Sequence, residues 1–169
     1  MEQDKTVNLD GADALEKIRA MVKKAKTCLF CSDIRTGVPM SVKPMLVLDV
    51  DDEGYLWFMV SDIAKTNDEL ESDPFVHLLF QTGPWTGMMN LYGISEEVDD
   101  EKKRKALWDS SLETWFDGPE DPQIELIRVE VLEGYYWEDK KTAPVAVFKT
   151  LKSGLRGDTD RGTEGQLTV

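Results

Sequence analysis

The amino-acid sequence predicts a mainly β fold with flanking helices, in which six antiparallel strands form a barrel. Two observations predict this fold class. About six short apolar segments are separated by turn signals, which is typical of strands joined as hairpins. Two other segments repeat their apolar residues every three to four positions, which indicates helices packed at the ends of the barrel. A doubly wound parallel sheet is disfavoured, because residues 27–60 contain three strand-like segments with only turns between them.

The first helix is expected over residues 10–27. Its apolar positions lie three to four residues apart, with charged residues between them, at Leu15, Ile18, Val22 and Ala25. This spacing places them on one face, as in an amphipathic helix that packs on a core. Asp10 or Asp13 can cap the first turn.

Residues 27–61 are expected to form three strands joined by turns. "TCLFCS" is a short apolar strand, "MSVKPMLVLDV" is a long one, and "YLWFMVS" is the second arm of a hairpin across the turn "DDEG". Pro44 lies inside the long strand, and proline cannot donate to a β ladder. The strand is therefore an edge strand, a bulged strand, or a strand whose backbone faces a ligand.

Two cysteines, Cys28 and Cys31, have the spacing of a redox or metal motif. A redox pair of this spacing works at a helix start, whereas residues three apart on a strand point to opposite faces. A structural zinc site usually needs four ligands, and the chain has only these two cysteines and one histidine. Both cysteines are therefore expected to be reduced and structural.

A short helix is expected over residues 62–74, followed by strands at 75–81 and 88–98. Gly93 marks a bulge or a close approach of two backbones in the second of these strands. His77 lies between apolar neighbours in the first strand. A single histidine in that setting is expected to be a packed, hydrogen-bonded core residue and not a catalyst.

Another helix is expected over residues 99–116, with three large side chains on one face, at Trp108, Leu112 and Trp115. A strand follows at 124–139, and a short helix is plausible over 143–154. The polar, glycine-rich residues 155–169 are expected to be a mobile tail. The chain is thus expected to be one domain, 1–169, with its core over about residues 10–140.

The charge of the chain narrows the classes of partner. With 33 acidic and 20 basic side chains the net charge is -13, which repels a polyanion, so nucleic acid is not expected as a partner. No apolar run approaches the length of about 20 residues that a spanning helix needs, so no membrane is expected. The N-terminus lacks the pattern of a secretory signal, and a cytoplasmic protein is the expectation.

Two lysines suggest an anion site. If the strands at 41–47 and 55–61 pair as a hairpin, Lys43 and Lys65 can flank one pocket and hold a phosphate, with backbone N–H groups of the following helix start aimed at the same place. Pro44 would leave backbone free for a flat ring. The alternative is structural: an edge-strand proline often only prevents aggregation, and such lysines are common on surfaces.

Five segments of the sequence resemble one known family. They are "TCLFCSD…GVPMSVKPM", "GYLWFMVSDIAKTNDELESDPFVHLLF", "LYGISEEVDDEKKRKALW", "WFDGPEDP" and "YYWED", and together they run over about residues 10–140. They resemble the pyridoxamine 5′-phosphate oxidase-like FMN-binding split-barrel superfamily, particularly its general stress protein branch. The resemblance implies a six-stranded antiparallel split β-barrel that is dimeric, with FMN at the interface of a homodimer.

The resemblance also implies the cofactor-binding residues. The family's motif of a basic residue, proline and methionine along the flavin corresponds to Lys43, Pro44 and Met45, with lysine where arginine is more usual. The aromatic strand that lines the ring with backbone groups corresponds to Phe58, Met59, Val60 and Ser61. The lysine that contacts the FMN phosphate corresponds to Lys65, although Ile63 and Ala64 replace the polar or basic residues common in the family. The second subunit covers the ring, for which the tryptophans and "WFDGPEDP" are candidates; helix packing is the alternative for Trp108 and Trp115.

The implied function is that of an FMN-binding protein related to pyridoxamine 5′-phosphate oxidase, a stress-associated, flavin-dependent oxidoreductase with no predicted catalytic side chain. That specific oxidase activity is not predicted, because the only C-terminal arginines, Arg156 and Arg161, lie in the expected tail. Two alternatives stay open: a non-catalytic stress module holding a flavin or another cofactor, and a structural dimer whose pocket is vestigial. The sequence does not name the small-molecule substrate or the electron donor.

Overall fold

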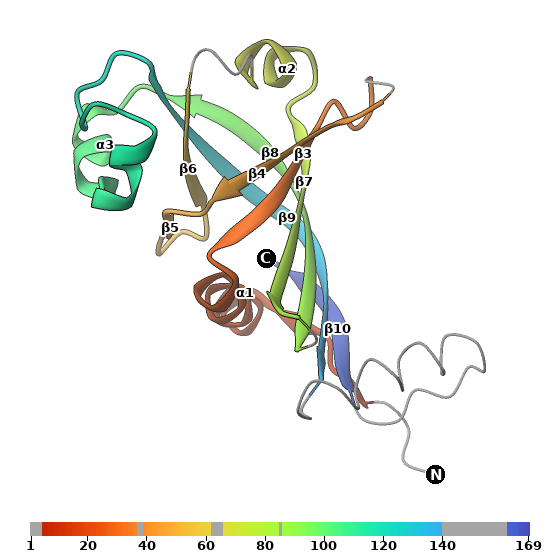
Figure 1. Ribbon diagram of the computed structural model, residues 1–169. Coiled ribbons are helices and arrows are strands. Elements are labelled where there is room, and N and C mark those ends of the chain that lie inside the picture. The colour runs from red at the N-terminus through yellow and green to blue at the C-terminus, as the bar shows by residue number, and fades with distance from the viewer. Residues whose placement is uncertain (1–4, 37–38, 62–65, 85, 140–161) are drawn as a thin grey trace.

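The computed structural model describes residues 5–36, 39–61, 66–84, 86–139 and 162–169 (Figure 1). Their strands are β1 (Lys5–Thr6), β2 (Leu9–Asp10), β3 (Thr27–Ser32), β4 (Ser41–Leu46), β5 (Asp49–Val50), β6 (Leu56–Ser61), β7 (Phe75–Gly83), β8 (Gly87–Val98), β9 (Ile124–Asp139) and β10 (Gly162–Thr168). Their helices are α1 (Gly11–Ala25), α2 (Thr66–Ser72), α3 (Glu101–Leu107) and the 3-10 turn η2 (Ser110–Thr114). The mainly β prediction is confirmed, although these residues form more strands than the six expected.

One curved sheet contains all the strands, in the order β1-β10-β9-β8-β7-β3-β4, and β6 joins it by pairing with β9. The pairings are antiparallel, except that β1 and β2 run parallel to β10. The long strand β9 pairs with β8 along most of its length, with β6 at its start and with β10 at its end. The sheet therefore curls around β9, and in the view of Figure 1 α2 lies near its top whereas α1 lies lower, beside β7 and β10.

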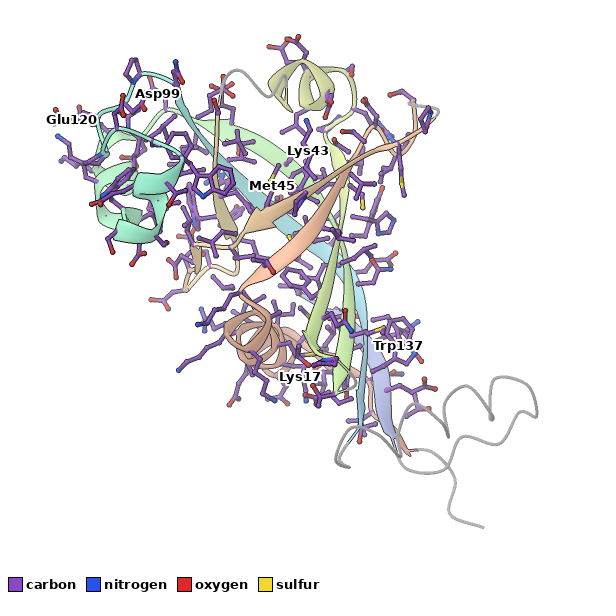
Figure 2. The ribbon with its side chains drawn as sticks, viewed as in Figure 1. Lys17, Lys43, Met45, Asp99, Glu120 and Trp137 are labelled. Atoms are coloured by element: carbon purple, nitrogen blue, oxygen red, sulfur yellow. The ribbon has the colours of Figure 1, made fainter. Side chains whose placement is uncertain are left out.

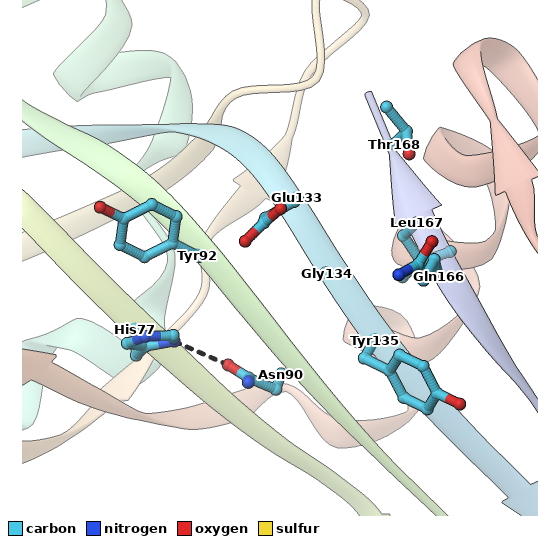
Figure 3. A pocket seen from close by; sticks show the side chains of 9 residues that line it. All are labelled: His77, Asn90, Tyr92, Glu133, Gly134, Tyr135, Gln166, Leu167 and Thr168. Atoms are coloured by element: carbon cyan, nitrogen blue, oxygen red, sulfur yellow. Dashed lines mark hydrogen bonds between the residues drawn. The ribbon is translucent and has the colours of Figure 1, made fainter.

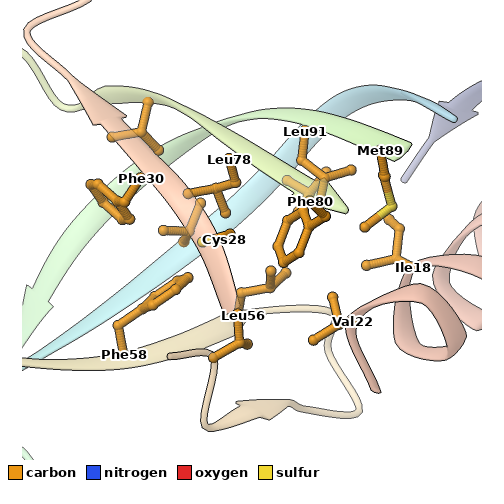
Figure 4. Close-up of a cluster of buried hydrophobic side chains, with 14 of the residues drawn as sticks. Ile18, Val22, Cys28, Phe30, Leu56, Phe58, Leu78, Phe80, Met89 and Leu91 are labelled. Carbon is orange, nitrogen blue, oxygen red and sulfur yellow. The ribbon is translucent and has the colours of Figure 1, made fainter. Parts of the chain in front are cut away.

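The main hydrophobic core lies between α1 and the inward face of the sheet (Figure 4). Ile18 of α1 and Phe58 of β6 are completely buried there. Phe58 meets the edge of Phe30 in a T-shaped contact with ring centroids 5.4 Å apart. The predicted helix is confirmed at Gly11–Ala25, because its apolar stripe covers this core.

The β bulge predicted at Gly93 is confirmed. Tyr92 pairs with Glu133 and Gly93 with Val131, so β9 carries one extra residue at this point. A Cβ atom on Gly93 would lie 2.3 Å from the carbonyl oxygen of Glu130. Only glycine allows the two backbones to come this close.

The predicted long strand at 40–50 is divided in two, so the predicted hairpin between 41–47 and 55–61 is wrong. Strand β4 pairs with β3, whereas β6 forms its hairpin with the two-residue strand β5 across the "DDEG" turn. The division falls at Val47, whose N–H donates to the carbonyl of Lys26, while the next N–H, of Leu48, donates to Trp57. The chain thus changes ladder partner in the middle of its apolar run.

The single helix predicted over 99–116 is also wrong. Helix α3 ends at Leu107, and Trp108 has an extended backbone with ψ of 129°. The carboxylate of Asp109 then accepts the N–H of Ser111 and begins the separate turn η2. Asp side chains compete with helical hydrogen bonds in this way, and the break leaves Trp115 77% exposed.

The predicted mobile tail at 155–169 is wrong for Gly162–Thr168, which form β10 and pair with β9. Leu167 is completely buried in the core, so this strand is part of the barrel. Residues 155–161 and the helix expected over 143–154 lie outside the described residues.

Both cysteines are free and buried, as predicted. Burial, with the nearby Cys31 adding to it, raises the pKa of the Cys28 thiol to about 12. Burial likewise raises the pKa of Cys31. Both thiols therefore stay protonated at neutral pH, and neither is a ready nucleophile. Among the described residues, no helix combines the length and the apolar character needed to cross a membrane.

Candidate cofactor site at the edge of strand β4

Strand β4 carries the basic-Pro-Met motif and ends the strand order of the sheet. Lys43 lies opposite Phe30 and Met45 opposite Cys28, and since both partners are buried, the two side chains lie on the inward face. Met45 packs against the main core, and Lys43 lies nearer to α2 (Figure 2). Pro44 is exposed on the opposite face. The edge position explains how β4 accommodates a residue without an N–H group.

Strand β6 has little side-chain surface left for a ligand. Phe58 and Val60 are buried in the main core, and Met59 packs against a smaller cluster formed by Leu112, Phe116 and Ile124. Ser61 is half-buried. These residues can offer backbone groups to a ligand. Strand β5 pairs only with Leu56 and Trp57, so the edge of β6 that faces β5 is not covered by β5 at residues 58–61.

Strands β4 and β6 approach each other without forming a ladder in the described part of the chain. The sheet is therefore interrupted between them. Strand edges at such an interruption present backbone N–H and C=O groups that a flat polar molecule can use in place of another strand. Lys43 and Met45 thus lie on a strand that approaches β6, the strand that carries residues 58–61. Lys65 lies outside the described residues, so its predicted position beside Lys43 stays a prediction.

The Lys43 ammonium pairs with a carboxylate that the sequence reasoning missed. Its Nζ lies 2.9 Å from Oε2 of Glu69 in α2, and the Ser32 hydroxyl of β3 donates to the same oxygen over 2.8 Å. Burial alone would raise the pKa of Glu69, but the hydrogen bonds from Lys43, Ser32 and Ser41 outweigh it and lower that pKa. A signal was present: a lysine inside a strand that is otherwise apolar needs a counter-charge, and "TNDELES" is the acidic segment that follows.

The helix start near residue 62, which was predicted to bind an anion, lies outside the described residues. The described helix has only 7 residues and already carries Asp68 and Glu69 in its first turn. Carboxylates at this position interact favourably with the helix dipole. Their negative charge opposes binding of a phosphate at the described part of this helix.

A second ion pair fixes the chain where α2 leads into β7. The carboxylate of Asp73 is completely buried and accepts the N–H of Arg35 at 2.7 Å, Nε of Arg35 at 3.0 Å and the N–H of Phe75 at 3.2 Å. The Arg35 guanidinium also lies 3.9 Å from the centre of the Phe75 ring. Burial opposes ionisation of Asp73, but these hydrogen bonds prevail and lower its pKa. The pair therefore joins the loop after β3 to the end of α2.

His77 lies on the outward face of the sheet, beside a polar pocket of about 220 Å³ (Figure 3). Its Nδ1 is 2.9 Å from Oδ1 of Asn90, and its ring tilts against that of Tyr92. The predicted hydrogen bond of His77 is confirmed, but its predicted place in the core is wrong, because the residue is half-buried on the outward face. The pocket is lined by His77, Asn90, Tyr92, Glu133, Gly134, Tyr135, Gln166, Leu167 and Thr168.

The same outward face carries exposed apolar side chains on five neighbouring strands, which are called the outward apolar face below. These side chains are 39% to 54% exposed, and they are Leu29, Val42, Leu79, Met88 and Trp137. Leu29 pairs with Leu79, and Met88 pairs with Trp137, while Asn90 and Gln81 lie between these two pairs. Several large apolar side chains exposed on one face of a sheet are typical of an interaction surface.

Comparison with known proteins gives concordant matches. A family model described as "Pyridoxamine 5′-phosphate oxidase like" matches residues 13–160. General stress protein 26 of Bacillus subtilis (strain 168) is 29% identical over 66 residues, which is 37% of this chain and 47% of that protein. The match thus spans about half the length of that curated relative.

Two solved structures show the likeness in fold. General Stress Protein 26 from Bacillus anthracis str. Sterne superposes with a TM-score of 0.63 and 22% identity, over 72% of this chain and 92% of that one. The general stress FMN/FAD binding protein from Xanthomonas citri superposes with a TM-score of 0.65 and 21% identity, over 78% of this chain and 93% of that one. At these identities the likeness establishes a shared fold.

Proposed function

Because this chain belongs to the pyridoxamine 5′-phosphate oxidase-like family, we propose that it binds FMN between β4 and β6 as a homodimer and acts as a flavin-dependent oxidoreductase. The observation that carries the proposal is the interruption of the sheet between two strand edges, one of which bears the family's motif at Lys43, Pro44 and Met45. The name of the Xanthomonas citri relative, which describes it as an FMN/FAD binding protein, supports the choice of cofactor.

The residues present fit such a group. An isoalloxazine ring has a rim of carbonyls and nitrogens, and two strand edges offer backbone donors and acceptors for that rim. Pro44 has no backbone N–H group, so it adds no unpaired donor to the edge of its strand. The Lys43 ammonium supplies N–H donors for the rim of the ring. Because the side chains of Phe58, Met59 and Val60 are packed, these residues and Ser61 contribute through their backbone. Lys65 is assigned to the phosphate by sequence resemblance alone.

When bound, FMN supplies the redox chemistry, since its ring accepts and returns electrons. The chain's own residues hold and orient the ring between the strands and exclude water from it. A general acid or base is not part of the proposal, and His77 is not assigned one, because its Nδ1 is engaged with Asn90 on the outward face of the sheet. General stress protein 26, the name of two relatives, suggests a setting in stress responses.

A second copy of the chain is the proposed cover for the outward apolar face. Burying Leu79, Met88 and Trp137 against the same residues of another chain removes apolar area from water on both sides, which favours association. Trp115 and the segment 115–122 lie outside this face, so they are not assigned to the interface. Sedimentation of the purified chain should give the mass of a dimer; a monomer at micromolar concentration would refute this part of the proposal.

The cofactor proposal is tested by adding FMN to the purified full chain and following flavin fluorescence. Saturation at one FMN per chain is expected, and fluorescence that never departs from that of free FMN would refute the proposal. Addition of reduced nicotinamide cofactor and an electron acceptor to the loaded protein then separates an oxidoreductase, which turns over steadily, from a flavin carrier, which does not.

A further inference from the structure

The polar pocket on the outward face has no role in the proposed flavin site. It is lined by residues of β7, β8, β9 and β10 and has a volume of about 220 Å³ (Figure 3). Lys43 and Met45 instead face inward from β4, and β3 separates β4 from β7 in the order of the sheet. A ligand in this pocket would therefore bind apart from FMN.

The pocket has a half-buried floor and an exposed polar rim. The floor is formed by His77, Asn90, Tyr92 and Tyr135, and the rim by Glu133, Gln166 and Thr168. In the described part of the chain, the carboxylate of Glu133 has no hydrogen bond or ion pair. In the view of Figure 3 it lies between Tyr92 and Gln166. Both of its oxygens can therefore accept hydrogen bonds from a ligand.

The charge at the pocket is negative. Glu133 lies on its rim, and none of its lining residues is a lysine or an arginine. A second carboxylate, that of Glu164, interacts with Tyr135 of the floor: burial, followed by the charge and the hydrogen bond of Glu164, raises the pKa of the Tyr135 hydroxyl. The pocket therefore repels an anion and attracts a cation.

The aromatic rings of the floor are held by their neighbours. The ring of Tyr92 stacks on Phe75 with centroids 5.6 Å apart, and it meets the tilted ring of His77 at 5.1 Å. The ring of Tyr135 packs on Trp137 with centroids 4.7 Å apart. Such rings offer apolar surface to the body of a ligand, and their faces attract positive charge.

We propose that this pocket binds a small organic cation, a protonated amine on an apolar or aromatic body, with Glu133 as its counter-charge. The body packs on the aromatic floor, and the ammonium group donates to the carboxylate on the rim. The volume is below the range of about 300 to 1,000 Å³ that is typical of drug-sized ligands, so the ligand is small. The inference goes beyond the proposed flavin function and does not depend on it.

Benzylamine, benzyl alcohol and benzoate test the proposal, because they carry a cationic, a neutral and an anionic group on the same ring. Each is titrated into the nitrogen-15-labelled full chain at about pH 7.5, where a histidine side chain is normally neutral. Dissociation constants come from the amide shifts of Asn90, Gly134 and Gln166. The titrations are repeated with Glu133→Gln and with the matched control Glu130→Gln, which removes an exposed carboxylate of the same strand outside the pocket. Circular dichroism establishes that each variant is folded.

The expected result is that benzylamine binds about fivefold more tightly than benzyl alcohol, and that benzoate causes no saturable shift. The factor is modest because Glu133 is exposed, so water screens its ion pair with the amine. Glu133→Gln should weaken benzylamine by about the same fivefold and leave benzyl alcohol unchanged. Glu130→Gln should change the benzylamine affinity by less than about twofold. Added salt should weaken benzylamine but not benzyl alcohol.

Three outcomes would overturn the inference. Equal affinity for benzylamine and benzyl alcohol would mean that the pocket does not select a cation. Equal losses in Glu133→Gln and Glu130→Gln would mean that the amine only follows the overall negative charge. No saturable shift with benzylamine would mean that the pocket holds only water or is covered by a second copy, whose proposed interface adjoins it where Asn90 pairs with Leu79.

The flavin provides an independent check. Saturating FMN should leave the benzylamine affinity unchanged, whereas competition between them would place the amine in the flavin site and overturn the inference. A chain that binds benzylamine but not FMN would refute the proposed function alone. The comparison of the three ligands on the wild type decides the question even if a variant fails to fold.

Discussion

Replacing Asp73 by alanine should lower the free energy of unfolding by about 3 kcal/mol. The carboxylate is completely buried and accepts three hydrogen bonds, from the N–H of Arg35, from Nε of Arg35 and from the N–H of Phe75. Alanine removes all three acceptor contacts at once. The loop after β3 and the end of α2 then lose their connection.

The magnitude follows from the exposure of each donor. A partly buried backbone N–H that loses its acceptor costs about 1 kcal/mol, and there are two of them, on Arg35 and Phe75. The Arg35 side chain is 53% exposed, so water replaces most of its bond and its share is at most about 1 kcal/mol. The three terms together give the expected 3 kcal/mol. Asp73→Asn keeps one acceptor oxygen and should lose about half as much.

Urea unfolding followed by tryptophan fluorescence measures the effect. Asp109→Ala is the control, because Asp109 is exposed and accepts a single N–H, from Ser111; its loss should cost about 1 kcal/mol. If Asp73→Ala costs no more than this control, then the buried carboxylate does not join the loop to the helix, and the account of this region is refuted.

Three further predictions concern the rest of the barrel. Gly93→Ala should destabilise the fold by about 3 kcal/mol in urea unfolding, because its Cβ would lie 2.3 Å from a backbone oxygen; a loss below 1 kcal/mol would contradict the bulge geometry. Leu79→Glu should convert the dimer to a monomer in sedimentation without unfolding it, and an unchanged mass would exclude the outward apolar face as the interface. In acid, the lowered pKa values of Glu69 and Asp73 mean that the unfolded state binds more protons, so stability is present above about pH 4.5 and falls below it; an urea midpoint that rises on acidification through this range would contradict the assignment.

Local signals in the sequence predicted the elements that depend on neighbours in the chain. The spacing of apolar residues fixed helix α1, the proline indicated that β4 lies at an edge, and Gly93 indicated the bulge. Each of these follows from a rule that operates within a few residues. The prediction of reduced, structural cysteines was confirmed for the same reason.

The failures came from interactions between distant residues or from competition within a segment. Strand β10 reads as a polar tail, and only its pairing with β9 and the burial of Leu167 make it part of the barrel. The break at Trp108 arose because Asp109 caps a new turn in a sequence that otherwise has helical spacing. The sequence indicated Lys43 but not its partner Glu69, because Glu69 lies 26 residues further along the chain.

Hydrogen–deuterium exchange of the full chain, with and without saturating FMN, tests most directly whether the ligand lies between β4 and β6. Without FMN, amides on the unpaired edges of these strands should exchange quickly, because no ladder protects them. With FMN, protection should appear in peptides covering Ser41–Leu46 and Leu56–Ser61. Saturating FMN that leaves both peptides unprotected, or protects only other strands, would contradict the central claim.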